Sequence, residues 1–346
     1  MTVRTDELAR STSGAASQAD PIRIGTRASD LARTQSQLVA DAITAGTGRS
    51  CLLVPVTTSG DMSTRPLSEI GGTGVFVTAL RAALVAGEVD VAVHSLKDLP
   101  TAPSPELVLA AVPEREDPRD ALVSRGRRTL DELPAQSRVG TGSPRRAAQL
   151  RTLRDDLDVV DIRGNVDTRV RKVADGDVDA VLLARAGLAR LGRLGEVSEV
   201  LEPERMLPAP GQGALAVECR AGDGALAALL RSALENLAAR VAVTAERSLL
   251  RALEAGCTAP VGALAELSGG QVRLRAVAAD VEGRTAVHGV LSAAAGEAAD
   301  LGRRLADQML ADGAAGLFAP IPGSTPGPTP GPPPGPTPGP TPGLAR

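Results

Sequence analysis

Cationic and hydroxyl side chains follow four short β-rich runs of this sequence. They occupy residues 26–29 after IRIG, 94–100 after VDVAV, 142–146 after RVGT and 163–169 after VVDI. Ligands of open α/β sheets bind beyond the carboxyl ends of the strands, so these segments predict one shared site. Arginine forks, a lysine ammonium and hydroxyls at such a place predict an anionic ligand.

The segment that begins with Ser143 and Pro144 has the features of an anion site. Ser143 suits a helix N-cap, and proline at the first helical position leaves backbone N–H groups available. Arg145 and Arg146 follow directly, so an anion is expected there. Several charge-assisted contacts of about 1.5–3 kcal/mol each would hold a polyanion. The alternative is a capped helix whose arginines are only solvated.

Lys97 and Asp98 place a cation beside a carboxylate just after a buried strand. Neighbouring positive charge keeps such a carboxylate ionised. It could stabilise a cationic intermediate or move protons between nitrogens. A structural ion pair that closes the loop explains the same residues equally well.

Two further segments have local features that leave their role open. Residues 70–76 are rich in glycine but lack the spacing of a nucleotide loop, so a mobile lid or a close backbone approach fits better. Phe76 could stack on a flat ligand or pack in a core. Cys257 lies in a loop without a nearby His or Asp partner, which indicates a buried or tethering thiol rather than a protease-type nucleophile.

The elements that would position these residues alternate between strands and helices. Strands are predicted at 22–25, 52–56, 89–93, 159–162 and 179–183, and helices at 30–44, 75–86, 144–154 and 166–175. This alternation is typical of α/β sheets covered on both faces. The last third differs, because a helix near 240–255, three strands and a helix from about 296 predict a small α+β domain.

Two segments rich in Pro, Gly and charge, 113–120 and 207–213, are predicted to connect two lobes and to lie side by side. The strand at 214–220 would then return to the first lobe and leave a binding cleft between the lobes. The expected units are a disordered leader at 1–20, domain 1 at 21–113 and 214–235, domain 2 at 114–213, domain 3 at 236–319, and a disordered Pro/Gly-rich tail at 320–346.

Composition narrows the function classes for the 346 residues. The chain has 36 Arg but two Lys, a net charge of −3 and only two aromatic residues, which argues against nucleic-acid binding. Its three Cys form no CxxC and lie near no His at metal spacing, so neither a metal site nor a disulfide framework is expected. Without a signal-peptide core or a spanning apolar run, we expect a cytoplasmic protein that does not bind a membrane.

Taken together, these motifs resemble the porphobilinogen deaminase (hydroxymethylbilane synthase) family. The matching segments, in the family's order across residues 22–320, are IRIGTRAS, GGTGVF, AVHSLKDLP, EREDPRDA, VGTGSPRR, RGNVDTR, LPAPGQGA, RVAVTAER and EAGCTAPVG. HSLKDLP and the cysteine loop are the most specific of them. The glycine loop departs from many relatives, because Thr73 stands where they place Lys.

The resemblance implies two periplasmic-binding-protein-like α/β lobes, the first one discontinuous, and a small C-terminal α+β domain with a three-stranded sheet. It implies a monomeric transferase of tetrapyrrole (haem) biosynthesis. Four porphobilinogen molecules would condense head to tail into linear hydroxymethylbilane, with release of ammonia, on a dipyrromethane cofactor bound to Cys257 as a thioether. Asp98 would be the catalytic carboxylate, stabilising the cation left when porphobilinogen loses ammonia.

The resemblance also assigns binding roles, residue by residue. The implied cofactor-binding residues are Cys257, Lys97, Asp98, Thr141, Ser143, Arg145, Arg146, Arg163 and Arg169. The implied substrate-binding residues are Arg23, Arg27, Ser29, Gln35, Phe76, Arg163, Arg169 and Arg190.

Two other classes of protein compete with an enzyme. A two-lobed binding protein for an anion would explain the arginines, but it would not explain a third domain with a loop cysteine. An interaction protein acting through the proline tail would leave the strand-end residues unexplained.

Overall fold

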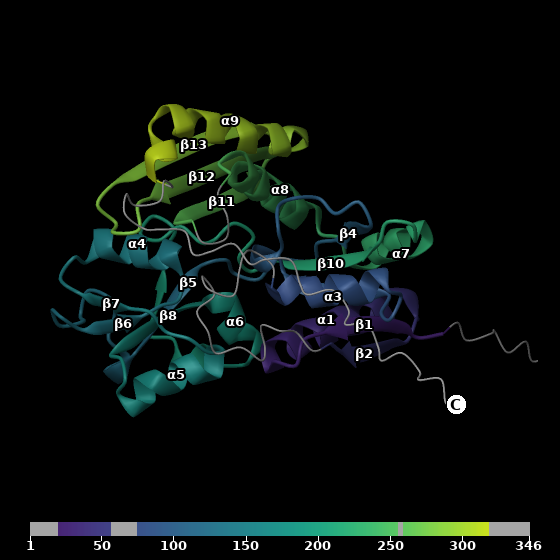
Figure 1. The fold of residues 1–346 in the computed structure, drawn as a ribbon, viewed down its shortest axis with the longest axis horizontal. Coiled ribbons are helices and arrows are strands. Elements are labelled where there is room, and N and C mark those ends of the chain that lie inside the picture. The colour runs from purple at the N-terminus through teal and green to yellow at the C-terminus, as the bar shows by residue number, and fades with distance from the viewer. Residues whose placement is uncertain (1–19, 57–74, 255–258, 318–346) are drawn as a thin grey trace, which may run out of the picture.

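The computed structural model describes residues 20–56, 75–254 and 259–317. Figure 1 shows two α/β lobes beside each other and a third, smaller domain packed against both. The predictions made for the leader, Thr73, Cys257 and the Pro/Gly-rich tail lie outside the described residues. No helix within the described part of the chain is long and apolar enough to cross a membrane.

The described strands are short in the two lobes and longer in the third domain. They are β1 (Ile22–Thr26), β2 (Cys51–Pro55), β3 (Val91–Ser95), β4 (Leu107–Ala111), β5 (Asp120–Ser124), β6 (Arg138–Gly140), β7 (Asp158–Val160), β8 (Ala180–Ala184), β9 (Glu199–Leu201), β10 (Leu215–Arg220), β11 (Val261–Ser268), β12 (Gln271–Ala279) and β13 (Ala286–Ala294). The helices are α1 (Asp30–Thr47), α3 (Val75–Val85), α4 (Pro144–Leu153), α5 (Val166–Asp175), α6 (Arg185–Arg190), α7 (Gly224–Leu234), α8 (Leu237–Ala252) and α9 (Ala298–Ala311).

The first lobe is a five-stranded sheet of order β2-β1-β3-β10-β4. Helices α1 and α7 pack together on one face, and α3 packs against β3 on the other. Burial on both faces explains why β3 is a nearly continuous apolar run. Strand β1 runs parallel to β2 and β3, and β10 is antiparallel to β3 and β4, so the carboxyl ends of β1 and β3 share one edge with the start of β10.

The second lobe repeats this plan with the order β7-β6-β8-β5-β9. Helix α4 contributes to a core of leucines and Val139 on one face, whereas α5 contributes to a valine-rich core on the other. Local capping sets the limits of α5, because Asn165 Oδ1 accepts the backbone N–H of Thr168 and Gly176 takes the left-handed conformation that ends the helix.

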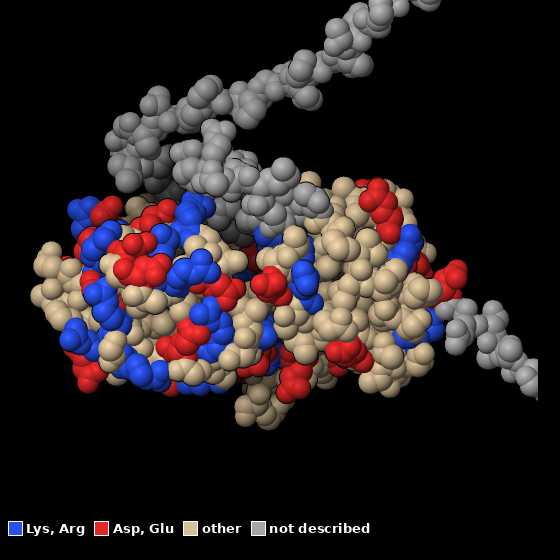
Figure 2. Space-filling view, turned by 90° about the horizontal axis from the view of Figure 1, so that it is seen from below, with Lys and Arg blue, Asp and Glu red and all other residues tan. Residues whose placement is uncertain are grey.

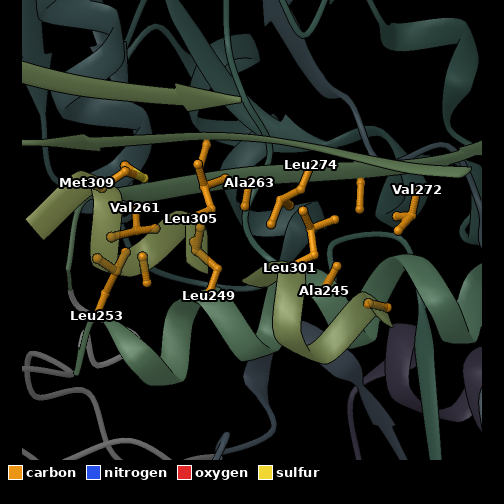
Figure 3. Close-up of a cluster of buried hydrophobic side chains, with 14 of the residues drawn as sticks. Ala245, Leu249, Leu253, Val261, Ala263, Val272, Leu274, Leu301, Leu305 and Met309 are labelled. Atoms are coloured by element: carbon orange, nitrogen blue, oxygen red, sulfur yellow. The ribbon is translucent and has the colours of Figure 1, made fainter. Parts of the chain in front are cut away.

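The third domain packs α8 and α9 on one face of the antiparallel sheet β11-β12-β13. Figure 3 shows how Leu249 of α8 and Leu301 and Leu305 of α9 meet Val261 and Leu274 of the sheet. These side chains are almost completely buried, so the domain has a core of its own.

The two segments predicted to connect the lobes, 113–120 and 207–213, cross between them and lie side by side. The backbone N–H of Glu116 donates to the carbonyl of Gly213 at 3.3 Å, and Gln212 Nε2 donates to the carbonyl of Pro118 at 2.7 Å. Gly213 has a φ of +87°, and a Cβ there would lie 2.2 Å from the Glu116 carbonyl oxygen, so only glycine permits this approach.

The predicted fold class is confirmed: two α/β sheets and a small three-stranded α+β domain are present. The named strands and helices all occur, with limits that differ by a few residues. The structure adds α6, α7, β4, β5 and β9, which the periodicity of the sequence did not indicate.

Candidate functional site

At the edge of the first lobe, the loop after β1 meets the end of β3. Ser29 caps α1 by accepting the backbone N–H of Ala32 at 3.4 Å. Gln35, in the second turn of α1, is 4% exposed, and its Nε2 donates to Ser95 Oγ at 3.0 Å. Ser29, Gln35 and the half-buried Arg27 therefore all lie at this edge of the first lobe.

Lys97 and Asp98 lie in a 3₁₀ turn, Leu96–Asp98, that directly continues β3. The turn is fixed to the start of β10, because the backbone N–H of Leu96 donates to the carbonyl of Ala214 at 3.0 Å. The Asp98 residue is exposed, so its carboxylate is accessible to a ligand, while Lys97 is half-buried. Burial lowers the pKa of Lys97 to about 8, an effect that the nearby charges of Arg146 and Arg145 increase and those of Asp98 and Asp120 oppose.

The sequence analysis expected the guanidinium groups of Arg145 and Arg146 either to face an anion or to be solvated, and the structure excludes the solvated alternative. Both are almost fully buried and pair with Asp120, whose side chain is inaccessible. Arg145 Nη1 donates to Asp120 Oδ2 at 2.7 Å, and Arg146 Nε donates to Oδ1 at 2.9 Å. The positive charge at the start of α4 is therefore partly neutralised within the protein by Asp120.

The buried group of Asp120, Arg145 and Arg146 also contacts Gln212, which lies in one of the two segments that cross between the lobes. Gln212 Nε2 donates to Asp120 Oδ1 at 2.8 Å, and Arg146 Nη2 donates to Gln212 Oε1 at 3.3 Å. Burial alone would raise the pKa of Asp120, but Arg145 and Arg146 hold it well below its usual range. Asp120 thus stays ionised and fixes two arginines close to the strand ends.

Ser143 lies at the start of α4, as predicted, and Thr141 directly follows β6. Ser143 is the N-cap residue and Pro144 opens the helix, although the Ser143 side chain makes no capping hydrogen bond. Instead, the backbone N–H of Ser143 donates to Thr141 Oγ1 at 3.2 Å. A Cβ on the intervening Gly142 would lie 2.8 Å from the carbonyl oxygen of Ile162, so this glycine allows two strand ends to approach each other.

Arg163 and Arg169 are more accessible than Arg145 and Arg146. Arg163 is half-exposed and lies 3.6 Å from Asp161. Arg169 Nε donates to the carbonyl of Gly164 at 2.9 Å. The pKa of Arg169 is lowered to about 10, mainly by burial and then by the positive charges of Arg146 and Arg163, while Asp161 opposes the shift. Positive charge is therefore in excess at this edge.

Two residues predicted to bind substrate, Arg23 and Arg190, bond to other parts of the protein. Arg23 lies near the amino end of β1, opposite the strand-end edge, where it forms a two-pronged ion pair with Asp90. The structure does not bring Arg23 to the candidate site, because its position in the strand determines which edge it faces. Arg190 lies at the lobe junction and donates to the carbonyl of Gly213 at 2.6 Å.

The two remaining predictions cannot be placed at the site. Phe76 belongs to the first turn of α3, but its side chain lies outside what the structure describes. Cys257 is also outside, although the described chain stops at Glu254, just beyond α8, and resumes at Ala259, just before β11.

A cavity of about 620 Å³ lies elsewhere, between the crossing segments, α8 and β11. None of the predicted site residues is among its described lining residues. Its arginines also have carboxylate partners: Arg115 pairs with Glu246, and Arg275 pairs with Glu204. This cavity therefore lacks the excess of positive charge that distinguishes the strand ends.

The sequence analysis missed Asp120 and Gln212 as parts of the site. Both lie in segments that it identified only as connections between lobes. A carboxylate at the start of a buried strand, in a chain with arginine pairs elsewhere, is a signal for an internal partner. Within the described ranges, no three His, Cys, Asp or Glu side chains gather as a metal site would require.

Two α/β lobes with cationic strand ends, an exposed carboxylate at the strand ends of the first lobe and a third domain define a two-lobed protein suited to an anionic ligand. A family model described as "Porphobilinogen deaminase, dipyromethane cofactor binding domain" matches residues 22–228, and a second, "Porphobilinogen deaminase, C-terminal domain", matches residues 240–311. The chain belongs to the porphobilinogen deaminase family.

Curated relatives agree with this assignment. The chain is 53% identical to porphobilinogen deaminase of Nocardia farcinica over 317 residues, which cover 89% of this chain and 91% of that protein. It is 56% identical to porphobilinogen deaminase 1 of Streptomyces coelicolor over 309 residues, covering 86% and 97%. A solved structure, the methionine binding protein MetQ, matches with a TM-score of 0.40 and 12% identity over 61% of this chain and 89% of that one.

The family models and the curated relatives confirm the predicted function. The protein is a hydroxymethylbilane-synthesising transferase of tetrapyrrole biosynthesis that acts on porphobilinogen, and it contains the family's dipyrromethane cofactor-binding domain.

The residues present fit a dipyrromethane group, whose acetate and propionate side chains make it a polyanion. Burial is the main cause of the lowered pKa of both Arg169 and Lys97, so each cation has lost hydration that a bound carboxylate would replace. Arg145 Nε is buried and has no hydrogen-bond partner among the described residues. Bound carboxylates would satisfy these groups.

Proposed function

We propose that the exposed carboxylate of Asp98 is the catalytic group and that cations of both lobes hold the acidic side chains of substrate and cofactor. The observation that supports this division most directly is the position of Asp98. It is accessible, directly follows a buried strand, and lies next to a lysine within the electrostatic reach of Arg145, Arg146 and Asp120.

Asp98 would act on the substrate by accepting hydrogen bonds from pyrrole nitrogens. When porphobilinogen loses ammonia, positive charge spreads onto the ring nitrogen, and a nearby fixed carboxylate stabilises that charge. The same oxygen can carry a proton away from the new carbon–carbon bond. The dipyrromethane group, when bound, supplies the free pyrrole end to which porphobilinogen units are added.

Arg163 and Arg169 are proposed to bind carboxylates directly, with Lys97, Thr141, Ser143, Arg27 and Ser29 around them. Arg145 and Arg146 would contribute mainly through their charge and through the unpartnered Nε of Arg145, since Asp120 occupies much of their hydrogen-bonding capacity. Gln35 would orient Ser95 and Arg190 would hold the crossing segment, because both already bond within the protein.

Cys257 is proposed to hold the cofactor as a thioether. Its loop connects α8 to β11, so the cofactor would be tethered to the third domain and would reach into the cleft between the lobes. We further propose that domain 1 comprises 21–113 and 214–235, domain 2 comprises 114–213 and domain 3 comprises 236–319, and that the enzyme is a cytoplasmic monomer.

The test compares Asp98→Asn with Asp155→Asn, because Asp155 is also an exposed aspartate but precedes β7 at the other edge of the second lobe. Removing a general acid–base group typically lowers turnover by about 10²–10⁴-fold. We expect a loss of this size for Asp98→Asn, with unchanged cofactor mass, and wild-type product formation for Asp155→Asn. Wild-type turnover by Asp98→Asn would contradict the proposed role.

A further inference from the structure

An arginine of the third domain reaches the turn that carries Lys97 and Asp98. Arg247 Nη1 donates to the carbonyl of Leu99 at 2.8 Å, and its Nη2 donates to the carbonyl of Pro100 at 2.7 Å. A longer contact of 3.5 Å joins Nη1 to the carbonyl of Leu96. One guanidinium thus contacts both the start of the turn and the residues that follow it.

Arg247 lies on a helix that belongs to another domain. Leu249 and Ala245, its neighbours on α8, point into the core of the third domain, as Figure 3 shows. Arg247 itself points away from that core and bonds to residues about 150 positions earlier in the chain, as the 147- and 148-residue separations of its two short bonds show. Any displacement of α8 is therefore transmitted to the turn of the first lobe.

The geometry requires arginine rather than simply a positive charge. The carbonyls at the end of a helical turn lack partners within the turn, and they need donors from elsewhere. The planar guanidinium presents two N–H groups in a fixed fork and can satisfy two carbonyls at once. A lysine ammonium is a compact charge on a flexible stem, so it would hold this pair less firmly.

The opposite side of the turn is held independently. Leu96 donates its backbone N–H to the carbonyl of Ala214, and a Cβ on Gly211 would come within 3.2 Å of the Leu96 side chain. The crossing segment therefore holds one side, and Arg247 holds the other. Without Arg247, the turn would keep its fold but lose the contact that fixes its exposed residues.

We propose that Arg247 is a positioning residue, which holds the turn of Lys97 and Asp98 at a fixed orientation to the third domain. The proposal rests on the role of Asp98 proposed above. Because α8 also leads into the segment that contains Cys257, the same helix would set the position of the tethered cofactor relative to the carboxylate that acts on the incoming substrate.

The first experiment compares Arg247→Gln with Arg251→Gln. Arg251 is an exposed arginine one turn further along α8, so it controls for loss of charge on this helix. A misplacement of about 1 Å can lower a rate about 100-fold, and we expect kcat of Arg247→Gln to fall about tenfold or more with KM nearly unchanged. Arg251→Gln should match the wild type in both constants.

Three further measurements separate positioning from a folding defect. The intact mass of denatured Arg247→Gln should still include the cofactor, and its thermal unfolding should remain a single transition near that of the wild type. Arg247→Lys should recover part of kcat, because the ammonium can still reach one carbonyl. If Arg247→Gln does not fold, Arg247→Lys provides the test, with a reduced kcat expected and a wild-type kcat contradicting the proposal.

A double-mutant cycle tests whether Arg247 acts through Asp98. In the Asp98→Glu background the carboxylate is already displaced, so Arg247→Gln should cost clearly less than it does in the wild type. Equal losses in both backgrounds would overturn the proposal for Arg247 while leaving the role of Asp98 intact. A wild-type rate for Asp98→Glu would show that the exact position of the carboxylate does not limit turnover, which would also overturn the positioning role of Arg247.

Discussion

The two lobes share a sheet plan but differ in how their strand ends handle charge. At the first edge, the carboxylate of Asp98 is exposed. At the second edge, the carboxylate of Asp120 is completely buried and bound by Arg145 and Arg146. On the face seen in Figure 2, blue and red side chains also crowd the second lobe on the left, while the first lobe on the right is mostly tan.

This difference separates two tasks that polyanion chemistry requires. A carboxylate that acts on a cationic centre must be accessible, whereas clustered arginines need a fixed internal counter-charge to remain close together. In the proposed division, the second lobe uses an aspartate for structure, and the first uses an aspartate for chemistry. The comparison predicts that equivalent substitutions in the two lobes affect different measured quantities.

The largest expected effect on stability is that of Asp120→Asn. The variant leaves two buried guanidinium groups without their counter-charge, and breaking such a buried pair costs about 3–5 kcal/mol. Denaturant unfolding at neutral pH should reveal this loss, with Asp155→Asn as the exposed control. A loss no greater than that of the control would remove the distinction between the two aspartates.

The loss of unfolding free energy caused by Asp120→Asn should depend on pH. The folded pKa of Asp120 lies below its ordinary value, so its stabilising contribution is present above the unfolded pKa of about 3.9. As the pH falls below that value, the contribution decreases. The difference in unfolding free energy between wild type and Asp120→Asn should therefore shrink in acid.

Arg163→Ala should have an intermediate effect, and on catalysis rather than stability. Arg163 is half-exposed, and a charge-assisted hydrogen bond to a substrate carboxylate is worth about 1.5–3 kcal/mol. We expect kcat/KM to fall by about 10- to 150-fold with unfolding nearly unchanged. Arg171→Ala, which changes an exposed arginine on the neighbouring helix, should leave both unchanged. Equal kinetics for the two variants would show that Arg163 is only surface charge.

The smallest expected effect is the pH dependence that Lys97 gives to the first lobe. Its pKa of about 8 means that the free enzyme loses a carboxylate-binding charge as the pH rises through that value. The kcat/KM for porphobilinogen, which reports the free enzyme, should therefore fall above about pH 8. Arginine remains charged throughout, so Lys97→Arg should shift this decline to higher pH. An unchanged profile in the variant would assign the decline to another group.

Local patterns were sufficient to predict much of the fold. Ser29, Pro144 and Asn165 mark helix starts by rules that act within a few residues, and the structure has helices at all three places. The short helix α6 and the three-residue strand β9 were not predicted, because such elements depend on tertiary packing more than on periodicity.

The site was predictable in its residue types but not in its internal partners. Motif positions placed Lys97, Asp98, Arg163 and Arg169 at strand ends. The burial of Arg145 against Asp120 depends on residues 25 positions apart in sequence, and the contact of Arg247 spans nearly 150 positions, 148 for its bond to Leu99. Arg23 was misplaced because its motif gives its neighbours in sequence but not the edge that it faces.

The most direct test of the account is the intact mass of the denatured, purified protein beside a Cys257→Ser variant. Denaturation removes every group that is not covalently bound. The account predicts a wild-type mass excess equal to two deaminated porphobilinogen units and no excess in the variant. A wild-type protein that stays at its bare mass after incubation with porphobilinogen, or a variant that carries the same excess, would contradict it.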